Sequence, residues 1–333
     1  NSKNKDSEVN VLVAGGAGYI GSVTAAELLA QGHRVVVYDN LDRGHRAAVP
    51  KGAAFVHADL GDAATLRQTF AENKIDAVMH FAAHSQVGES MQKPELYYEN
   101  NVVVGKVILD AMRAEGVNYI IFSSTCATFG EPQQLPITED LPQLPTNPYG
   151  ETKLVFERML HWYHTVHGLN YTILRYFNAC GAAYELGEDH DPESHIIPIV
   201  LQVALGQRDK VTIFGDDYPT QDGTCVRDYI HILDLARAHI LAMDKKMDTA
   251  SHYNLGNGKG FSVKEVIEVA RKVTGKSIPA VIGERRAGDP PLLIGSAEKI
   301  IRELDWQPVY PDLESIVKSA WEWHQAHPHG YDE

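Results

Sequence analysis

Tyr149 and Lys153 are a pair of side chains that could carry out proton transfer. They stand four residues apart in a segment with helical periodicity, so both side chains project from one face of the helix. A phenol ionises near pH ~10 when nothing perturbs it, and a nearby cation favours its ionised form. The pair therefore predicts a general base that works near neutral pH. The alternative is an amphipathic helix that exposes one tyrosine.

A run of hydroxyl side chains, Ser123-Ser124-Thr125, directly follows an apolar segment that is predicted to be a strand. Open parallel sheets bind their ligands at the carboxyl ends of strands, where a hydroxyl could pass a proton to a phenol. Such residues are also common in helix caps and turns. Together with Tyr149 and Lys153, the run predicts a catalytic group of hydroxyl, phenol and ammonium.

A glycine loop near the N-terminus could hold the phosphates of a dinucleotide, because Gly15, Gly18 and Gly21 occupy its first, fourth and seventh positions. It joins the first predicted strand to the first predicted helix, where missing β-carbons let a pyrophosphate approach the helix N-terminus. Asp39 ends the next strand, and a carboxylate there accepts ribose hydroxyls and repels a 2′-phosphate. The loop predicts NAD rather than NADP; the alternative is a tight turn.

The elements that must position these residues alternate between short apolar strands and helices. This alternation predicts an α/β fold with a doubly wound parallel sheet of the Rossmann type. Strands are predicted at 9–14, 34–38, 54–56, 77–81, 119–122 and 171–174, and helices at 24–31, 63–73, 102–115 and 149–167. After Gly181, loop-rich sequence with helices near 196–205, 262–273 and 313–326 predicts a smaller α+β region.

The composition narrows the class of protein. The chain has 333 residues, of which 44% are apolar and 22% charged, which is typical of globular proteins and enough for about two domains. Its 30 Lys and Arg against 44 Asp and Glu give a net charge of −14. This charge argues against a broad surface for nucleic acid or anionic membrane. No stretch approaches the ~18 apolar residues of a membrane helix.

Cysteine and histidine usage points away from disulfides and metals. The three cysteines, Cys126, Cys180 and Cys225, lack zinc-ligand spacing, and their odd number favours a reducing, cytoplasmic compartment. The 16 histidines are scattered without an HExxH motif, so we expect no metal. The polar N-terminus over 1–8 has no apolar signal core and is predicted to be a loose tail.

Longer motifs make the chain similar to the extended short-chain dehydrogenase/reductase family, and within it to the NAD-dependent nucleotide-sugar 4-epimerases. The similarity runs from about Val9 to Tyr331. It rests on the glycine loop, His-Phe-Ala-Ala at 80–83, Val-Gly-Glu-Ser at 87–90, Tyr-Tyr-Glu-Asn-Asn at 97–101, Tyr-Gly-Glu-Thr-Lys at 149–153, Leu-Arg-Tyr-Phe-Asn at 174–178, Asp-Gly-Thr-Cys-Val-Arg-Asp-Tyr-Ile-His at 222–231 and Arg-Arg-Ala-Gly-Asp at 285–289. The last three motifs are much more specific than the glycine loop.

The resemblance implies interconversion of UDP-glucose and UDP-galactose, with NAD held as a tightly bound prosthetic group. Tyr149 would take the proton of the sugar 4-hydroxyl with help from Thr125, while the C4 hydride moves to the nicotinamide. The 4-keto sugar would then turn its other face, and the hydride would return. Lys153 would hold the nicotinamide ribose and favour the phenolate.

The resemblance also implies two sets of binding residues. The cofactor set is Gly15, Gly18, Tyr19, Ile20, Gly21, Asp39, Asn40, Asp59, Leu60, Phe81, Ala82, Ala83, Asn100, Tyr149, Lys153 and Phe177, with Asp59 accepting from the adenine amino group. The substrate set is Thr125, Asn178, His195, Phe214, Arg227, Arg286, Asp289 and Leu293. In it, Asn178, Arg227 and Arg286 would meet the diphosphate, Asp289 the uridine ribose and Phe214 the uracil face.

The sequence departs from the family pattern at three places. His84-Ser85 replaces a cofactor-contacting lysine of some members, and His195 stands where others have an asparagine. Leu293 occupies the position that gates the sugar pocket, where a larger aromatic residue excludes an N-acetyl group. We therefore expect some tolerance for UDP-N-acetylglucosamine and UDP-N-acetylgalactosamine.

The sequence also suggests three rival functions. A nucleotide-sugar 4,6-dehydratase needs carboxylic acid/base groups after the active-site threonine, and Cys126 and Ala127 cannot supply them. A UDP-pentose 4-epimerase would use the same chemistry in a pocket of different size. A non-catalytic NAD-sensing protein of the same fold need not keep the catalytic hydroxyls or the arginines.

The resemblance and the element pattern together predict a division of the chain. The NAD-binding domain is expected over 9–180, rejoined by about 230–256, and the UDP-sugar-binding domain over 181–229 and 257–330. A homodimer formed through a pair of helices is expected from the family.

Overall fold

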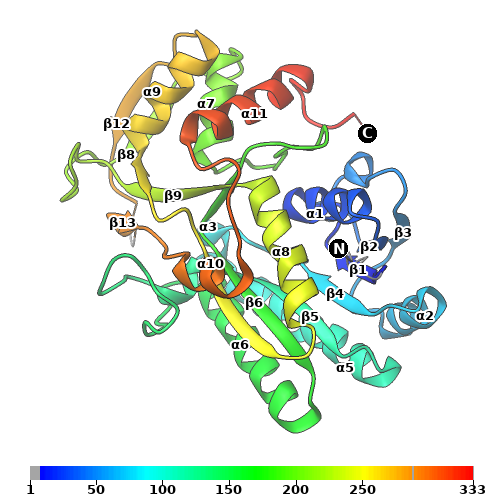
Figure 1. The fold of residues 1–333 in the computed structure, drawn as a ribbon. Helices are drawn as coiled ribbons and strands as arrows, with labels where there is room; N and C mark the ends of the chain where they lie inside the picture. The colour runs from blue at the N-terminus through cyan, green and yellow to red at the C-terminus, as the bar shows by residue number, and fades with distance from the viewer. Residues whose placement is uncertain (1–7, 287–288, 333) are drawn as a thin grey trace, which may run out of the picture.

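A parallel sheet of seven strands forms the centre of the computed structural model, which describes residues 8–286 and 289–332 (Figure 1). The strand order is β10-β6-β5-β4-β1-β2-β3, so the order reverses between β1 and β4. The strands are β1 (Asn10–Ala14), β2 (Arg34–Asp39), β3 (Ala54–His57), β4 (Ala77–His80), β5 (Tyr119–Thr125), β6 (Asn170–Tyr176) and β10 (Ala250–Leu255). A reversal of this kind opens a crevice for ligands beyond the carboxyl ends of the strands.

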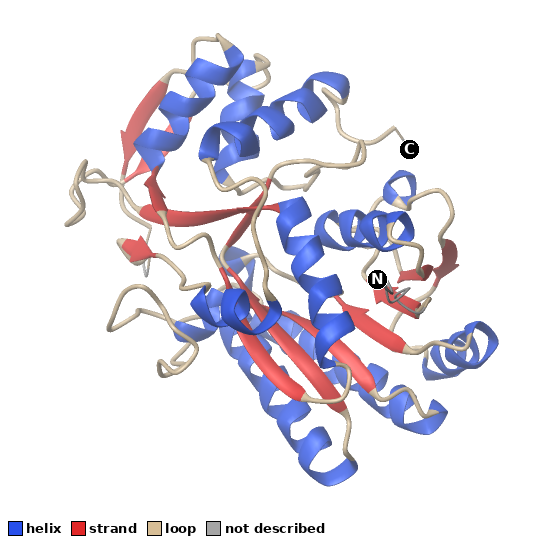
Figure 2. Cartoon of the chain, viewed as in Figure 1, coloured by secondary structure: helices blue, strands red, loops and turns tan. Residues whose placement is uncertain are grey.

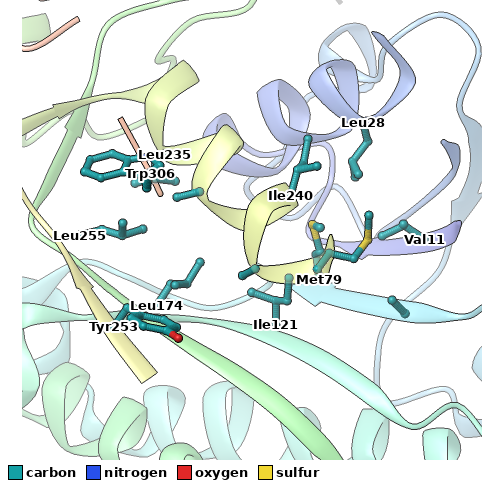
Figure 3. Packing of buried hydrophobic residues seen from close by; sticks show 14 of the residues in the cluster. Val11, Leu28, Met79, Ile121, Leu174, Leu235, Ile240, Tyr253, Leu255 and Trp306 are labelled. Atoms are coloured by element: carbon teal, nitrogen blue, oxygen red, sulfur yellow. The ribbon is translucent and has the colours of Figure 1, made fainter. Parts of the chain in front are cut away.

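Helices cover both faces of this sheet, since alternate strand residues enter two different cores. Val11 and Val13 of β1 pack with Leu28, Leu235 and other residues of one core (Figure 3), whereas Leu12 enters the other. The first core is closed by α1 (Tyr19–Ala30), α8 (Ile232–Lys246) and α10 (Glu298–Leu304), and the second by α2 (Ala63–Asn73), α5 (Gly105–Glu115) and α6 (Pro148–His167). The predicted fold class is confirmed.

A second region is built around the strand β9 (Val226–His231), which pairs with three other strands. These are β7 (Asn178–Cys180), β11 (Gly260–Ser262) and β13 (Leu292–Leu293), and a separate pair is formed by β8 (Val211–Phe214) and β12 (Ala280–Gly283). The helices α7 (Ile196–Ala204), α9 (Val263–Thr274) and α11 (Leu313–Ala326) enclose a third core, and Figure 2 shows them grouped at one end of the molecule.

Several element boundaries differ from the sequence prediction. The first helix begins at Tyr19 instead of residue 24, because Gly18 is extended and forms its N-cap. The fifth strand continues through Thr125, since its three hydroxyl residues pair with β6. The helix predicted over 102–115 starts as a π-helix over Glu99–Val104, preceded by α3 (Val87–Ser90) and α4 (Pro94–Tyr98).

Two further expectations concern the ends of the chain and the membrane. The tail predicted over 1–8 lies, apart from Glu8, outside the described residues. Within the described part of the chain, no helix combines the length and the apolar character needed to cross a bilayer.

Candidate active site

Tyr149 lies in the first turn of α6, next to the end of β5. Asn147 caps the helix by accepting a hydrogen bond from the Gly150 amide at 2.8 Å. A β-carbon at Gly150 would lie 2.5 Å from the Ala127 carbonyl oxygen, so only glycine lets this turn approach the residues after β5. Burial raises the pKa of Tyr149 to about 12, and a hydrogen bond with the Thr125 side chain opposes this shift. The structure thus brings Tyr149 and Thr125 together.

Lys153 lies one turn further along α6, and its side chain reaches β5. Its ammonium donates a hydrogen bond to the Ser123 carbonyl at 2.8 Å and lies 4.9 Å from the centroid of the Phe122 ring. Burial lowers the pKa of Lys153 to about 7, and the charge of Glu157 opposes this shift. The sequence predicts that the ammonium and a nicotinamide cation together favour the Tyr149 phenolate. In the protein alone, burial has the largest influence on the pKa of Tyr149 and raises it.

A buried ion pair supports Lys153 and was missed by the sequence argument. Arg175 of β6 donates to both carboxylate oxygens of Glu157, at 3.1 and 2.8 Å, and each side chain is only 5% exposed. Ser124 donates to the same carboxylate at 2.5 Å. The signal was the spacing of four between Lys153 and Glu157, which places both on one helix face.

The glycine loop has the shape that a dinucleotide pyrophosphate requires. Gly15 has φ +78°, and a β-carbon on it would lie 2.6 Å from the Ala82 amide nitrogen. A β-carbon on Gly21 would lie 2.2 Å from the Gly15 carbonyl oxygen. Gly18 begins α1 and offers no side-chain cap, so the first amides of the helix face the loop. The residues present therefore fit a phosphate group at the helix N-terminus.

The predicted adenosine side of the site lies beyond β2 and β3. Asp39 accepts hydrogen bonds from the amides of Ala17 at 2.9 Å and Leu41 at 2.8 Å, which ties it to the glycine loop. Burial raises the pKa of Asp39, although these amides oppose the shift. Asp59 accepts from the Asn40 side chain at 2.8 Å. The structure therefore places Asp39, Asn40 and Asp59 in one linked group.

The other predicted cofactor residues lie on several different elements. Tyr19 begins α1 and donates to the Gly181 carbonyl at 2.5 Å. At His84, where some family members have a cofactor-contacting lysine, the backbone amide donates to Asn101 at 2.9 Å and the carbonyl accepts from Asn101 at 3.0 Å. The remaining members are Ile20 in α1, Leu60 after β3, Phe81, Ala82 and Ala83 after β4, Asn100 in the π-helix and Phe177 after β6.

Four of the predicted substrate residues lie on β9 or next to it, namely Asn178, Arg227, Asp289 and Leu293. Arg227 makes a 2.5 Å ion pair with Asp289, and Leu293 of β13 pairs with Arg227 in register. Leu293 also packs against the apolar cluster that contains Phe177, while the Asn178 side chain donates to the Asp228 carbonyl at 3.1 Å. These contacts connect the substrate residues to the end of β6 and hence to the Tyr149 region.

Two predicted contacts are modified by the structure. The Arg286 guanidinium lies 4.0 Å from the centroid of the Phe214 ring, so one face of that ring is already covered. His195 is held 2.8 Å from Glu188 and 2.9 Å from Glu193. Burial lowers the pKa of His195, but these two carboxylates raise it well above its ordinary value overall. His195 is therefore engaged by carboxylates.

The fold and the site define a class: a Rossmann-type enzyme of the dehydrogenase/reductase kind, with a Tyr/Lys pair at the crevice of a doubly wound sheet. Residues 11–256 match the NAD dependent epimerase/dehydratase family. The chain belongs to this family, as the sequence predicted.

Relatives of known name match nearly the whole chain. The UDP-glucose 4-epimerase of Halalkalibacterium halodurans is 57% identical over 325 residues, covering 96% of this chain and 97% of that protein. The UDP-glucose 4-epimerase from Brucella ovis in complex with NAD has a TM-score of 0.91 and 48% identity, covering 94% of this chain and 98% of that one. The enzyme from Bifidobacterium longum in complex with NAD+ and UDP has a TM-score of 0.93 and 39% identity, covering 97% and 100%.

Proposed function

We propose that this chain is a UDP-glucose 4-epimerase that uses NAD and that Tyr149 moves the proton in its reaction. The names of the close relatives agree with this activity over nearly the full length. The observation that carries the assignment of the residue is the contact between Tyr149 and Thr125, at the end of the central strand β5 and beside Lys153.

The cofactor would be held by the glycine loop at its pyrophosphate and by the Asp39, Asn40 and Asp59 group at its adenosine end. When bound, NAD supplies a reversible acceptor for the C4 hydride of the sugar. The residues of this chain do the rest of the chemistry. Lys153, anchored on the Ser123 carbonyl, would hold the nicotinamide ribose.

Tyr149 is proposed to hold and return the proton of the sugar 4-hydroxyl. With a pKa of about 12 in the protein alone, the phenol is protonated near neutral pH. A positive charge beside it favours the phenolate and converts Tyr149 to a base. Thr125 can bridge the phenol and the substrate hydroxyl, because it contacts Tyr149 and ends the strand at the crevice. Proton removal is thereby coupled to the presence of the oxidised cofactor.

Arg227 is proposed to bind the substrate diphosphate, because a guanidinium matches phosphate oxygens with two parallel hydrogen bonds. Before substrate binds, the 2.5 Å ion pair with Asp289 compensates the partly buried positive charge of Arg227. Asp289 then becomes available to the uridine ribose, while Asn178 and Arg286 complete the diphosphate contacts. Phe214 would stack on uracil through the face that Arg286 leaves open.

Leu293 is proposed to leave room for an N-acetyl group at the sugar pocket. It is half-buried between Arg227 and the Phe177 cluster, and leucine is smaller than tyrosine. We therefore expect turnover of UDP-N-acetylglucosamine in addition to UDP-glucose. Complete absence of that turnover would refute the tolerance.

The division of the chain, its assembly and its compartment are also proposals. The pairing of β10 with β6 supports an NAD-binding domain over 9–180 that is rejoined by about 230–256, with the UDP-sugar region in 181–229 and 257–330. Trp162 and Val166 are 62% and 64% exposed on one face of α6, which supports a homodimer through paired helices. The cysteines are free, which supports a cytoplasmic, reducing compartment.

The experiment that tests the function needs no added cofactor. Purified protein is denatured and the released NAD is quantified, and the native protein is mixed with UDP-galactose alone. Formation of UDP-glucose without added NAD, together with about one released NAD per chain, supports the proposal. Dependence on added NAD with net production of NADH would point instead to an ordinary dehydrogenase.

A further inference from the structure

We propose that Glu188, His190, Glu193 and His195 form a binding site for one divalent transition-metal ion, with Zn²⁺ as the preferred ion. The four residues lie in the segment that leads from β7 to α7. Each offers one ligand atom, and these atoms lie within 4.8 Å of one another. The inference concerns a structural site and goes beyond the proposed reaction.

The distances between the four side chains fit tetrahedral coordination. Zn–N and Zn–O bonds of about 2.0–2.1 Å place neighbouring ligand atoms roughly 3.3 Å apart. The Glu188 oxygen lies 3.3 Å from His190 Nδ1 and 2.8 Å from His195 Nδ1. Glu193 oxygens lie 3.6 Å from His190 Nδ1 and 2.9 Å from His195 Nδ1. The Glu188 contact with His190 matches the expected edge length and that with His195 is shorter, and the two Glu193 contacts are made by different oxygens of that carboxylate.

Two of the ligand atoms are buried without a hydrogen bond, which is a separate sign of a missing partner. Among the described residues, neither Glu188 Oε1 nor His190 Nδ1 makes a hydrogen bond of acceptable geometry, although Glu188 Oε1 lies 2.8 Å from His195 Nδ1 and the Glu188 side chain is only 5% exposed. A buried carboxylate oxygen that lacks such a partner is costly. A cation at the centre of the four atoms would satisfy both atoms at once.

The rival explanation is a pair of ion pairs between two imidazolium and two carboxylate groups. It requires both histidine rings, whose centroids are 5.2 Å apart, to carry positive charge side by side. In that arrangement His195 Nδ1 bonds Glu193 Oε1 at 2.9 Å, and the Glu188 oxygen is left to His190 Nδ1, which lies 3.3 Å away without making a hydrogen bond. A single ion with two neutral imidazoles and two carboxylates gives the same net charge without this repulsion.

The type and number of ligands indicate which ion fits. Two imidazole nitrogens and two carboxylate oxygens, without sulfur, suit Zn²⁺ and related divalent ions better than Ca²⁺ or Mg²⁺. Two carboxylates neutralise the ion at a place that is buried at Glu188 and open to solvent at His195. Four protein ligands leave no open tetrahedral position, which is typical of structural zinc and not of catalytic zinc.

The surrounding contacts show what such an ion would stabilise. Glu193 accepts the amide of His195 at 2.7 Å, at the start of α7. His190 packs edge-to-face against Tyr19 at 6.1 Å between ring centroids, and Tyr19 begins α1 at the glycine loop. The Asp189 carboxylate accepts the Tyr331 amide at 3.0 Å. The ion would therefore fix the segment that connects the cofactor loop, the C-terminal segment and the second region.

The signal in the sequence was the pattern Glu-x-His-x-x-Glu-x-His over 188–195, which a search for HExxH or paired cysteines does not detect. The expectation of no metal rested on those two patterns alone.

The test measures bound metal directly. Untagged protein is purified from medium with zinc, and its metal content is determined by elemental mass spectrometry. We expect one zinc per chain in the wild type and its loss in His190→Asn and in Glu193→Gln. His161→Asn, at an exposed histidine of α6, is the matched control and should keep the zinc.

A second measurement keeps the proposal testable if either variant fails to fold. Metal-free wild-type protein is titrated with Co²⁺ and with Zn²⁺. Tetrahedral Co²⁺ absorption that saturates at one ion per chain, reversed by Zn²⁺, and a rise in Tm on zinc addition are expected. Wild type that holds no zinc and shows no Co²⁺ absorption, or variants that retain wild-type zinc, would overturn the site and favour the two ion pairs.

Discussion

Tyr149 and Lys153 are each shifted by burial toward their neutral forms, which has a consequence for control of the reaction. The pKa of Tyr149 is raised to about 12 and that of Lys153 is lowered to about 7. A phenol in this state keeps its proton until a cation lies beside it. We therefore propose that Tyr149 acts as a base only when the oxidised cofactor lies beside it.

Replacing Tyr149 by phenylalanine removes the proton-transferring hydroxyl group and keeps the aromatic ring. We expect kcat for UDP-galactose to fall about 10²–10⁴-fold, the usual contribution of general acid–base catalysis. The amount of NAD released on denaturation should be unchanged, because the glycine loop is intact. Steady-state rates and released NAD are measured on the same preparation. Unchanged turnover would remove Tyr149 from the mechanism, and loss of NAD would show a structural role.

Leu293→Tyr tests the proposed gate of the sugar pocket. The added phenol would fill space beside Arg227 and the Phe177 cluster, so an N-acetyl group should no longer fit. We expect turnover of UDP-N-acetylglucosamine to fall by at least about 10-fold, a difference of ~1.4 kcal/mol, while UDP-galactose turnover is kept. The measurement is the steady-state rate of wild type and variant with each of the two substrates. An equal loss on both would place Leu293 in general packing instead.

Helix α6 is the element that organises the site, because one of its faces carries Tyr149, Lys153 and Glu157 in successive turns. Glu157 joins this helix to Arg175 of β6 through two hydrogen bonds. The same carboxylate accepts from Ser124 of β5. The buried charges thus lock the helix to the two strands at whose ends the chemistry would occur.

Glu157→Gln keeps the shape of this side chain but leaves the buried Arg175 charge without its partner. Breaking one side of a buried ion pair costs ~3–5 kcal/mol, so the free energy of unfolding should fall by about that amount. Lys106→Met is the matched control, since its pair with Asp110 is an exposed one on α5 and should cost less than ~1 kcal/mol. Urea unfolding measures both. Equal losses in the two variants would contradict the importance of burial.

At the scale of the whole molecule, buried histidines make stability sensitive to acid. Burial lowers the pKa of His239 to about 4, and its ring is fully enclosed between Tyr176 and the Leu235 carbonyl. The unfolded chain binds a proton on this histidine near pH ~6.5. Between about pH 6.5 and 4 the unfolded state therefore holds one more proton, and stability falls as the pH drops through this window.

His239→Gln is expected to remove the contribution of His239 to the pH dependence of the free energy of unfolding. The slope of the free energy of unfolding against pH between 6 and 4.5 should become shallower by ~1.4 kcal/mol per pH unit. The slope is obtained from urea unfolding at several pH values, with the exposed His161→Gln as control. A slope identical to that of the wild type would contradict a buried, neutral His239.

Much of the fold could be predicted from the sequence because it depends on local periodicity. The helix over Ala63–Asn73 and that over Leu313–Ala326 were predicted to the residue, since each has a clear apolar stripe and an aspartate cap. The start of α1 at Tyr19 was not predicted. Its first residues are helical because of how they pack and because the extended Gly18 precedes them as the N-cap. The π-helix over Glu99–Val104 carries no local signal of its own.

The identity of the candidate site residues could be predicted from sequence motifs. Their pairing and their pKa shifts could not, because these depend on contacts in the folded protein. Tyr149, Thr125 and Lys153 could be selected from spacing and resemblance, and the structure brings them together. Two contacts of the site could not be predicted in this way: the Arg227–Asp289 ion pair and the stacking of Arg286 on Phe214. Each joins residues more than sixty positions apart, which only the packing of different strands brings together. The direction of the Tyr149 pKa shift depends on burial, which the sequence does not show.

The most direct test of the central claim follows the hydrogen at C4 of the sugar. The purified protein is incubated with UDP-galactose that carries deuterium at C4, and the UDP-glucose formed is analysed by NMR and mass spectrometry. If the site around Tyr149 holds the sugar through removal and return of that hydrogen, the deuterium is retained at C4 of the product. A product with solvent hydrogen at C4 would contradict the account.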